Sequence, residues 1–349
     1  MSTRHVFLLA ALAFILHAPS AAADNAALTK LTEGVYARVV SADGEAVANT
    51  GVVVFDESVL VFDTHFTPEG GTSLLSAIRA VTPKPVRYVV NSHWHADHTH
   101  GNQVFASAQL IGSSNARRDM LQLDLPSLNR TARVTQSQLD KLRQAMAREP
   151  DPGQRQTMRE QIRSREEYLQ TMSRLKIMPP VVALDESVTI RDGKQEARIL
   201  FLGAGHTDGD IVLYLPSQKV LFAGDLFFSS AIPNVQDANI LDWMRTLGAL
   251  LKLDADKFVP GHGPIGSKKD VEAFLSYFED LKALIQPAVD RGDSIEQITR
   301  ELQVPAKYSS YQFQNFFASN VQKMFAELKA LQIESKPAEN APRTEQRKP

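Results

Sequence analysis

The stretch His93-Trp94-His95-Ala96-Asp97-His98 decides how the rest of this sequence is interpreted. It follows the apolar run Val86 to Val90, whose length and β-branched residues predict a buried strand. A loop begins where a strand ends, and there side chains can converge on one point. Imidazole nitrogens and carboxylate oxygens suit Zn²⁺, so the stretch predicts part of a metal site. A solvated histidine-rich loop is the alternative interpretation of this stretch alone.

Three later positions add polar side chains where a predicted strand gives way to glycine. His206 follows Gly203-Ala204-Gly205, Asp225 follows Gly224, and His262 lies between Gly261 and Gly263. A single histidine at one strand end is more often structural. Three such positions beside the first stretch instead predict one shared site.

The full set of motifs resembles the metallo-beta-lactamase superfamily, whose signature is His-x-His-x-Asp-His followed by a later His, Asp and His. The resemblance covers about residues 35–266 and implies a four-layer αββα sandwich, in which helices flank two mixed β-sheets and the site lies at one edge. It also implies two Zn²⁺ ions per chain. The residues that it assigns to the first ion are His93, His95 and His206, those for the second are Asp97, His98 and His262, and Asp225 bridges the two. Asp63 matches an early aspartate of the family, which we expect to orient the ligand loop through hydrogen bonds.

The expected chemistry is hydrolysis, because metal ions bring the pKa of a bound water from about 15.7 to about 7. Asp97 is the predicted catalytic residue, since it can bind metal and also orient the nucleophile or move its proton. The candidate substrates are lactams, lactones, thioesters and phosphoesters, so β-lactamase activity is among the expected reactions. Asp225, however, stands where the best-known lactamases of the family have cysteine, and Leu226-Phe227-Phe228 lacks the lysine that those enzymes use to hold the substrate carboxylate.

Two other functions stay open at this point. One is an iron-dependent oxidoreductase on the same scaffold, such as a persulfide dioxygenase. The other is a metal-binding protein without catalysis. Diiron members favour extra carboxylates in place of a histidine, which this sequence does not show.

Composition and the first residues indicate an exported globular protein. The chain has 349 residues, 43% of them hydrophobic and 22% charged, and a formal net charge of −2, which gives no reason to expect nucleic-acid binding. Residues 1–23 resemble a cleavable signal peptide with Arg4, the apolar run Val6 to Leu16, and a cut after Ala23. We therefore expect a periplasmic or secreted protein without a membrane span after cleavage, acting on a small molecule. The absence of cysteine restricts metal ligands to His, Asp and Glu.

The pattern along the chain predicts a metallo-beta-lactamase-like domain over residues 24–266. Strands are expected at Gly34 to Val40, Thr50 to Phe55 and Val59 to Asp63, and again between Val181 and Ala223. Residues 115–178 predict an inserted helical hairpin, broken at Pro126 and at Pro150 to Gly153, which is either a lid or dimerisation arm or an inert excursion. A helical extension is expected over 267–333, with caps at Ser267/Asp270 and Asp293/Glu296, and a disordered tail over 334–349.

Other side chains near the motifs have open roles. His65 and His100 are candidates for lining the site or for supporting it, and Ser229 or Ser230 for anchoring a substrate. Aromatic side chains next to the predicted ligands are expected either in the core or in an apolar substrate wall; these are Phe66, Trp94, Phe227 and Phe228.

Overall fold

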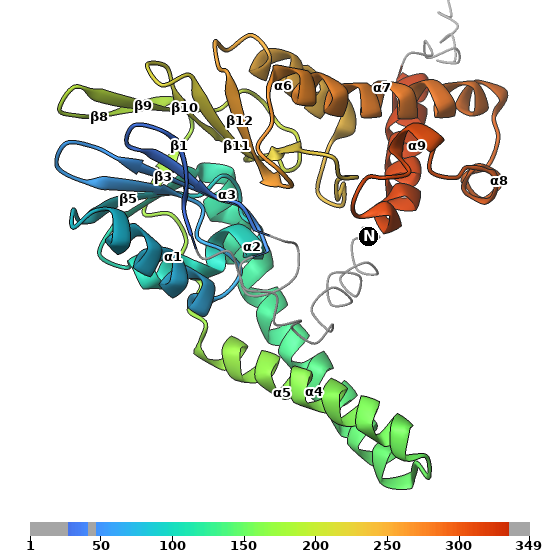
Figure 1. Cartoon of the computed structure of the whole chain (residues 1–349). Helices are drawn as coiled ribbons and strands as arrows, with labels where there is room; N and C mark the ends of the chain where they lie inside the picture. The colour runs from blue at the N-terminus through green and yellow to red at the C-terminus, as the bar shows by residue number, and fades with distance from the viewer. Residues whose placement is uncertain (1–26, 41–46, 335–349) are drawn as a thin grey trace, which may run out of the picture.

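The computed structural model describes residues 27–40 and 47–334. Two β-sheets lie face to face with helices on both outer sides (Figure 1). The first sheet has the strand order β1-β2-β3-β4-β5-β6-β7, and the second has the order β12-β11-β10-β9-β8. Both sheets are mixed, because β4 to β7 pair in parallel in the first sheet and β11 and β12 in the second, while the other pairs are antiparallel. The predicted αββα sandwich is therefore confirmed.

The strands are β1 (Thr29–Thr32), β2 (Val35–Arg38), β3 (Thr50–Val54), β4 (Val59–Phe62), β5 (Val86–Val90), β6 (Gln109–Ser113), β7 (Val182–Leu184), β8 (Val188–Asp192), β9 (Gln195–Leu200), β10 (Val212–Leu215), β11 (Val220–Phe228) and β12 (Lys257–His262). The helices are α1 (Pro68–Val81), α2 (Ala96–Thr99), the 3₁₀ helix η2 (His100–Phe105), α3 (Ser114–Asp119), the π-helical turn η3 (Met120–Asp124), α4 (Leu125–Arg148), α5 (Pro152–Arg174), α6 (Ile240–Leu250), α7 (Lys268–Arg291), α8 (Ile295–Glu301), the 3₁₀ turns η4 (Ala306–Tyr308) and η5 (Gln314–Phe316), and α9 (Phe317–Glu334).

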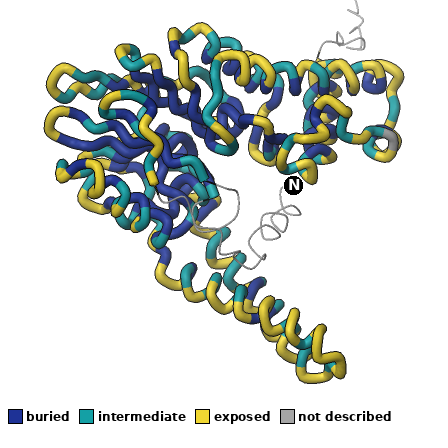
Figure 2. The backbone as a smooth tube through the Cα atoms, in the orientation of Figure 1, coloured by how far each residue is buried: buried dark blue, intermediate teal, exposed yellow. Residues whose placement is uncertain are grey.

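Three apolar clusters hold the four layers together. Between the sheets, Phe62 of β4 meets Phe222 of β11 with ring centroids 6.0 Å apart. Leu74 and Ile78 of α1 cover the outer face of the first sheet. Trp243 of α6 belongs to the cluster in which α6 and α7 cover the second sheet and α9 packs on these two helices. Figure 2 shows the buried residues running through both sheets, where apolar side chains leave water and so stabilise the fold.

Parallel pairing brings the predicted site residues to one edge. The carboxyl ends of β4 and β5 lie side by side, so Asp63 and the histidine stretch are neighbours. Asp225 differs from the prediction, because it lies inside β11 rather than after a strand. The pairing of β11 with β12 shifts register on both sides of Gly224, at the point where the strand presents Asp225. Such a register shift is typical of a β-bulge, which changes the direction of a neighbouring side chain, here that of Asp225.

The insert between β6 and β7 is a long helical hairpin formed by α4 and α5, which projects from the body of the protein (Figure 1). The sequence predicted a helix break at Pro126, and this prediction was wrong. The helix continues from η3 into α4 through this proline, and the π-helical turn of η3 lies directly before it. The hairpin is mostly exposed, and Arg143 of α4 contacts Glu166 of α5 at 2.6 Å. Its proposed role as a lid or dimerisation arm stays a prediction.

The C-terminal helices pack on α6. Ser267 and Asp270 form the predicted capping box at the start of α7. The prediction for α8 was wrong by one residue: Ser294 and Gln297 form its capping box, because the Ser294 hydroxyl accepts the unpaired amide. The domain boundaries at residues 24, 266 and 333 stay predictions. The predicted leader (1–23) and residues 335–349 of the predicted tail lie outside the described residues.

The carboxylate of Glu327 on α9 caps α6. It accepts hydrogen bonds from the N–H groups of Ile240 (2.9 Å) and Leu241 (3.0 Å). These amides open α6 and have no partner within the helix, so the extension supplies what the helix itself lacks. Among the described residues, no helix combines the length and apolar character that crossing a membrane requires.

Candidate metal centre

The histidine stretch divides between a loop and a short helix. His93 and His95 lie on the loop that leaves β5, whereas Asp97 and His98 lie in α2. The prediction placed all of them on a loop. The hydroxyl of Thr99 donates to the His95 carbonyl at 3.1 Å and thereby stabilises this turn.

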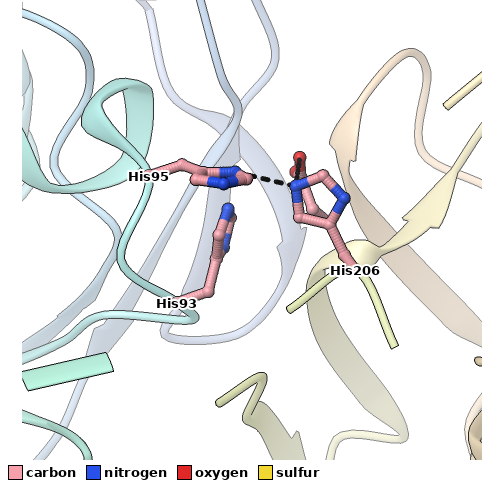
Figure 3. A group of neighbouring side chains, drawn as sticks. His93, His95 and His206 are labelled. Carbon is pink, nitrogen blue, oxygen red and sulfur yellow. Dashed lines mark hydrogen bonds and ion pairs between the residues drawn. The ribbon is translucent and has the colours of Figure 1, made fainter. Parts of the chain in front are cut away.

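The first group consists of His93, His95, His206 and Asp225. One potential ligand atom from each lies within 4.8 Å of all the others. Figure 3 shows His93 and His95 on one side and His206 opposite them, with the three rings converging. The closest approach joins Nδ1 of His95 and Nε2 of His206 at 2.8 Å.

The second group consists of Asp97, His98 and His262, which meet the same 4.8 Å limit. Oδ2 of Asp97 lies 3.2 Å from Nε2 of His262 and 3.6 Å from Nε2 of His98. The structure thus brings together all seven residues that the sequence singled out.

Asp225 lies between the two groups. Its Oδ1 is 3.1 Å from Nε2 of His98, while its Oδ2 is 3.3 Å from Nε2 of His206 and 3.5 Å from Nε2 of His262. One carboxylate therefore faces both groups: its Oδ1 faces His98 of the second group, and its Oδ2 faces His206 of the first and His262 of the second.

Hydrogen bonds behind the groups fix which ring nitrogen faces inward. Asp63 accepts a hydrogen bond from Nδ1 of His98 at 2.8 Å and one from the Ser92 hydroxyl at 2.7 Å. The Ser92 hydroxyl has a single hydrogen, so Nδ1 of His93, 2.9 Å away, is the donor to it. His93 and His98 therefore both turn Nε2 toward the centre. Asp63 thus holds this stretch through hydrogen bonds, and its role in orienting metal ligands stays a prediction.

These inward atoms fit a metal ion. Nε2 of His93, Nε2 of His98 and Oδ1 of Asp225 are buried, and no described residue gives any of them a hydrogen bond. Buried lone pairs that face one another cost free energy unless a cation or a proton lies among them. Imidazole and carboxylate are the donors that Zn²⁺ takes in four-coordinate sites, so the residues present suit that ion.

The charges of the groups support the same conclusion. Burial lowers the pKa of His206 to about 3, so its imidazole stays neutral, as a metal ligand must be. Burial acts the same way on His262, but the nearby carboxylates of Asp225 and Asp97 outweigh it and raise the pKa of His262 to about 9. Burial likewise opposes ionisation of Asp225, yet His262 and His98 hold its pKa well below the usual range. The centre thus holds negative charge that attracts protons or cations.

One residue of the site was missed by the sequence reasoning. Oδ2 of Asp237, in the loop before α6, lies 3.0 Å from Nε2 of His95. Burial disfavours protonation of His95, but the hydrogen bond and charge of Asp237 overcome it and raise the pKa of His95. Asp237 stands in the sequence without any motif around it, so no local signal points to it.

Four side chains had open roles in the sequence analysis, and their contacts in the structure place each of them relative to the two groups. His65 is buried against the Ala48 carbonyl, and its Nε2 lies 3.4 Å from Arg38. His100 contacts Asp124 rather than either group. The Ser229 and Ser230 backbones bond to His262 and Gln312, respectively, and no contact shows either side chain at the groups.

The aromatic candidates divide between core and site. Phe227 packs on Phe274 in the core. Trp94 lies against His95, and Phe228 stacks on His262, while Phe66 stacks on His100.

Comparison with known proteins identifies the family. The model of the metallo-beta-lactamase superfamily matches residues 43–262, which is more than half of the chain. The chain belongs to the metallo-beta-lactamase superfamily. The match ends at His262, so the helices from α7 onward lie beyond the part of the chain that the family model matches.

Relatives within the superfamily differ in activity. The chain is 22% identical over 280 residues to a linear primary-alkylsulfatase of Pseudomonas sp., covering 73% of this chain and 50% of the sulfatase. It is 25% identical over 299 residues to the alpha subunit of a 2,4-dinitroanisole O-demethylase of Nocardioides sp., covering 83% of this chain and 77% of that subunit. A solved metallo-beta-lactamase from Pontibacter korlensis, 21% identical, superposes with a TM-score of 0.53 over 72% of this chain and 98% of its own, which shows the shared fold.

The position of Asp225 requires glycine at residue 261. A Cβ atom at Gly261 would lie 1.8 Å from Oδ1 of Asp225. Any larger residue before His262 would therefore displace the carboxylate that lies between the two groups.

Proposed function

We propose that this protein is an exported, zinc-dependent hydrolase that holds two metal ions and cleaves an ester bond of a small molecule. The observation that carries the proposal is the position of Asp225, whose Oδ2 lies near His206 of the first group and whose Oδ1 and Oδ2 lie near His98 and His262 of the second. Seven donors are more than one tetrahedral ion uses, and a carboxylate that faces both groups lets two ions share them.

His93, His95 and His206 with Asp225 would hold one ion, and Asp97, His98 and His262 with Asp225 the other. Bound zinc supplies a hydroxide near neutral pH and polarises the bond under attack. Asp63, Ser92 and Asp237 hold three of the imidazoles in the tautomers that turn a lone pair inward.

Asp97 is the residue that we assign to proton transfer. Its side chain is 23% exposed, whereas that of Asp225 is 4% exposed, so a substrate or water reaches Asp97 more easily. Nε2 of His262 at 3.2 Å stabilises its carboxylate form. Asp97 is therefore ionised and can accept a hydrogen bond from an attacking water, which orients the water and places an acceptor beside its proton.

Two observations favour an ester over a lactam. Asp225 and Leu226 to Phe228 lack the cysteine and lysine expected of the best-known lactamases. The sequence alignments with an alkylsulfatase and an O-demethylase cover 73% and 83% of this chain, whereas the alignment with a metallo-beta-lactamase of Bacteroides fragilis covers 27%. The name of the sulfatase implies a sulfate ester as substrate, and neither of the first two names implies a lactam. The signal-like residues 1–23 support the proposal that the protein is exported. N-terminal sequencing of protein recovered from the periplasm tests this proposal, because the exported protein should begin at Asp24.

The test is a substrate panel on zinc-loaded protein starting at Asp24. It includes p-nitrophenyl acetate and octanoate, decyl sulfate, a thioester, a lactone, a phosphodiester and nitrocefin. We expect ester hydrolysis that Asp225→Ala abolishes together with metal content, whereas Asp290→Ala, at an exposed position of α7, keeps both. Rapid nitrocefin turnover without ester hydrolysis would make it a lactamase.

Metal analysis and an absorption spectrum of protein purified without added metal separate the remaining alternatives. Iron with no hydrolysis would favour an oxidoreductase. Two bound zinc ions without turnover of any panel member would favour a metal-binding protein.

A further inference from the structure

The segment between α8 and α9 reaches the candidate metal centre. The N–H of Gln312 donates to the Ser230 carbonyl, and the N–H of Ile232 donates to the Gln312 carbonyl, both at 3.0 Å. Both backbone groups of one residue are thus tied to the loop that follows β11, the strand of Asp225. This contact joins a part of the chain beyond residue 262, where the family match ends, to the edge of the site.

Phe313, the next residue, has an unusual backbone conformation. Its φ is +59° and its ψ is +36°, in the left-handed region that a bulky side chain rarely adopts. Ser230, its neighbour across the contact, also has a positive φ of +54°. Strained residues of this kind persist where the surrounding structure holds them, and they cluster at sites that contact ligands.

This conformation places the Phe313 ring beside His262. The two ring centroids are 6.0 Å apart and the planes are nearly perpendicular, at 89°. Phe228 stacks on the same imidazole at 5.2 Å and 24°. Phe313 is half-buried, whereas Phe228 is buried, so only Phe313 of these two rings also presents surface to solvent at this edge.

The side chains around the centre indicate which part of a substrate the Phe313 ring would contact. In the described part of the chain, the seven site residues form ion pairs with one another, with Asp63 and with Asp237, but with no lysine or arginine. On the other side of the centre, the half-buried Trp94 lies against His95 with centroids 4.5 Å apart. The part of the substrate that does not react would therefore meet aromatic surface.

We propose that Phe313 is a specificity-determining residue, which binds the apolar chain of an ester substrate beside His262. The inference rests on the proposed function for the reaction, but binding of an apolar ligand can be measured without turnover. The helical extension then has a function: it supplies one wall of the substrate site.

The experiment measures binding of octanoate and acetate to zinc-loaded protein by calorimetry. Octanoate stands for the acid product of an octanoyl ester, and acetate carries the same carboxylate without the chain. We expect wild type to bind octanoate more tightly than acetate. Phe313→Gly should weaken octanoate binding about tenfold, the size of one aromatic contact, and change acetate binding less than twofold.

Glycine is the informative substitution because it accepts the positive φ without strain, so the variant should fold. Its zinc content and circular dichroism spectrum should match those of wild type. Phe313→Leu, which keeps apolar surface, should recover much of the octanoate affinity. Tyr311→Ala removes a ring of the same segment that packs on Tyr308 instead, and should bind octanoate like wild type.

Octanoate binding by Phe313→Gly within twofold of wild type would overturn the proposal. So would a wild-type protein that binds octanoate no more tightly than acetate. Loss of ester hydrolysis with normal octanoate selectivity would instead count against the proposed reaction and leave the role of Phe313 intact.

Discussion

Nε2 of His100 lies 3.2 Å from both carboxylate oxygens of Asp124, and both side chains are buried. His100 begins η2 directly after the helix that carries Asp97 and His98, while Asp124 ends the π-helical turn at the root of the hairpin. The contact thus links the segment that carries the candidate ligands Asp97 and His98 to the helical insert. A π-helical turn at such a position is frequent at functional sites.

Asp124→Ala should destabilise the protein, because it leaves Nε2 of His100 buried without this acceptor. We expect a loss of about 1–3 kcal/mol in the free energy of unfolding, measured with urea. Asp140→Ala is the matched control, since Asp140 is exposed further along α4, and should change stability by less than about 0.5 kcal/mol. Equal stabilities of the two variants would show that the contact contributes nothing.

Asp237→Ala should weaken zinc binding. The substitution removes the acceptor of Nε2 of His95 and so frees the ring to turn its other nitrogen away from the centre. Loss of such a partner typically lowers metal affinity about 10- to 100-fold, which competition with a chelator would measure. Asp256→Ala, at an exposed position before β12, should bind zinc like wild type. Unchanged zinc affinity in Asp237→Ala would show that Asp237 does not support His95 as a ligand.

In the metal-free protein, His206 and His262 together should contribute most to stability near pH 6.5. The pKa of His206 is lowered from 6.5 to about 3, so the unfolded chain binds more protons between these values and stability rises with pH there. The pKa of His262 is raised from 6.5 to about 9, so its contribution is complete below pH 6.5 and is lost as pH rises to 9.

Thermal unfolding across pH, with chelator and with zinc, checks this expectation. Zinc takes the place of the proton on His262, so the decline between pH 6.5 and 9 should be absent from the zinc-loaded protein. His262→Gln should reduce the decline in the chelated protein. A midpoint that stays constant from pH 6.5 to 9 in chelated wild type would contradict the assignment.

The sequence by itself determined the candidate ligands, and its resemblance to the superfamily implied the αββα fold class. His93 to His98 places four donors in six positions, and His206, Asp225 and His262 each stand beside glycine near a strand end. These signals are local, because strand periodicity and glycine act over a few residues. Asp63 was placed by the resemblance to the superfamily, whose early aspartate it matches at the end of the predicted strand Val59 to Asp63.

Only the tertiary structure decided which residues support and border the centre. Asp237 and His95 are separated by 142 positions, and Phe313 meets His262 only because the extension docks on the loop after β11. An isolated aspartate or phenylalanine carries no motif, and its partner depends on how distant elements pack. Long-range packing, rather than local propensity, therefore determines how the histidines are held and what surface a substrate meets.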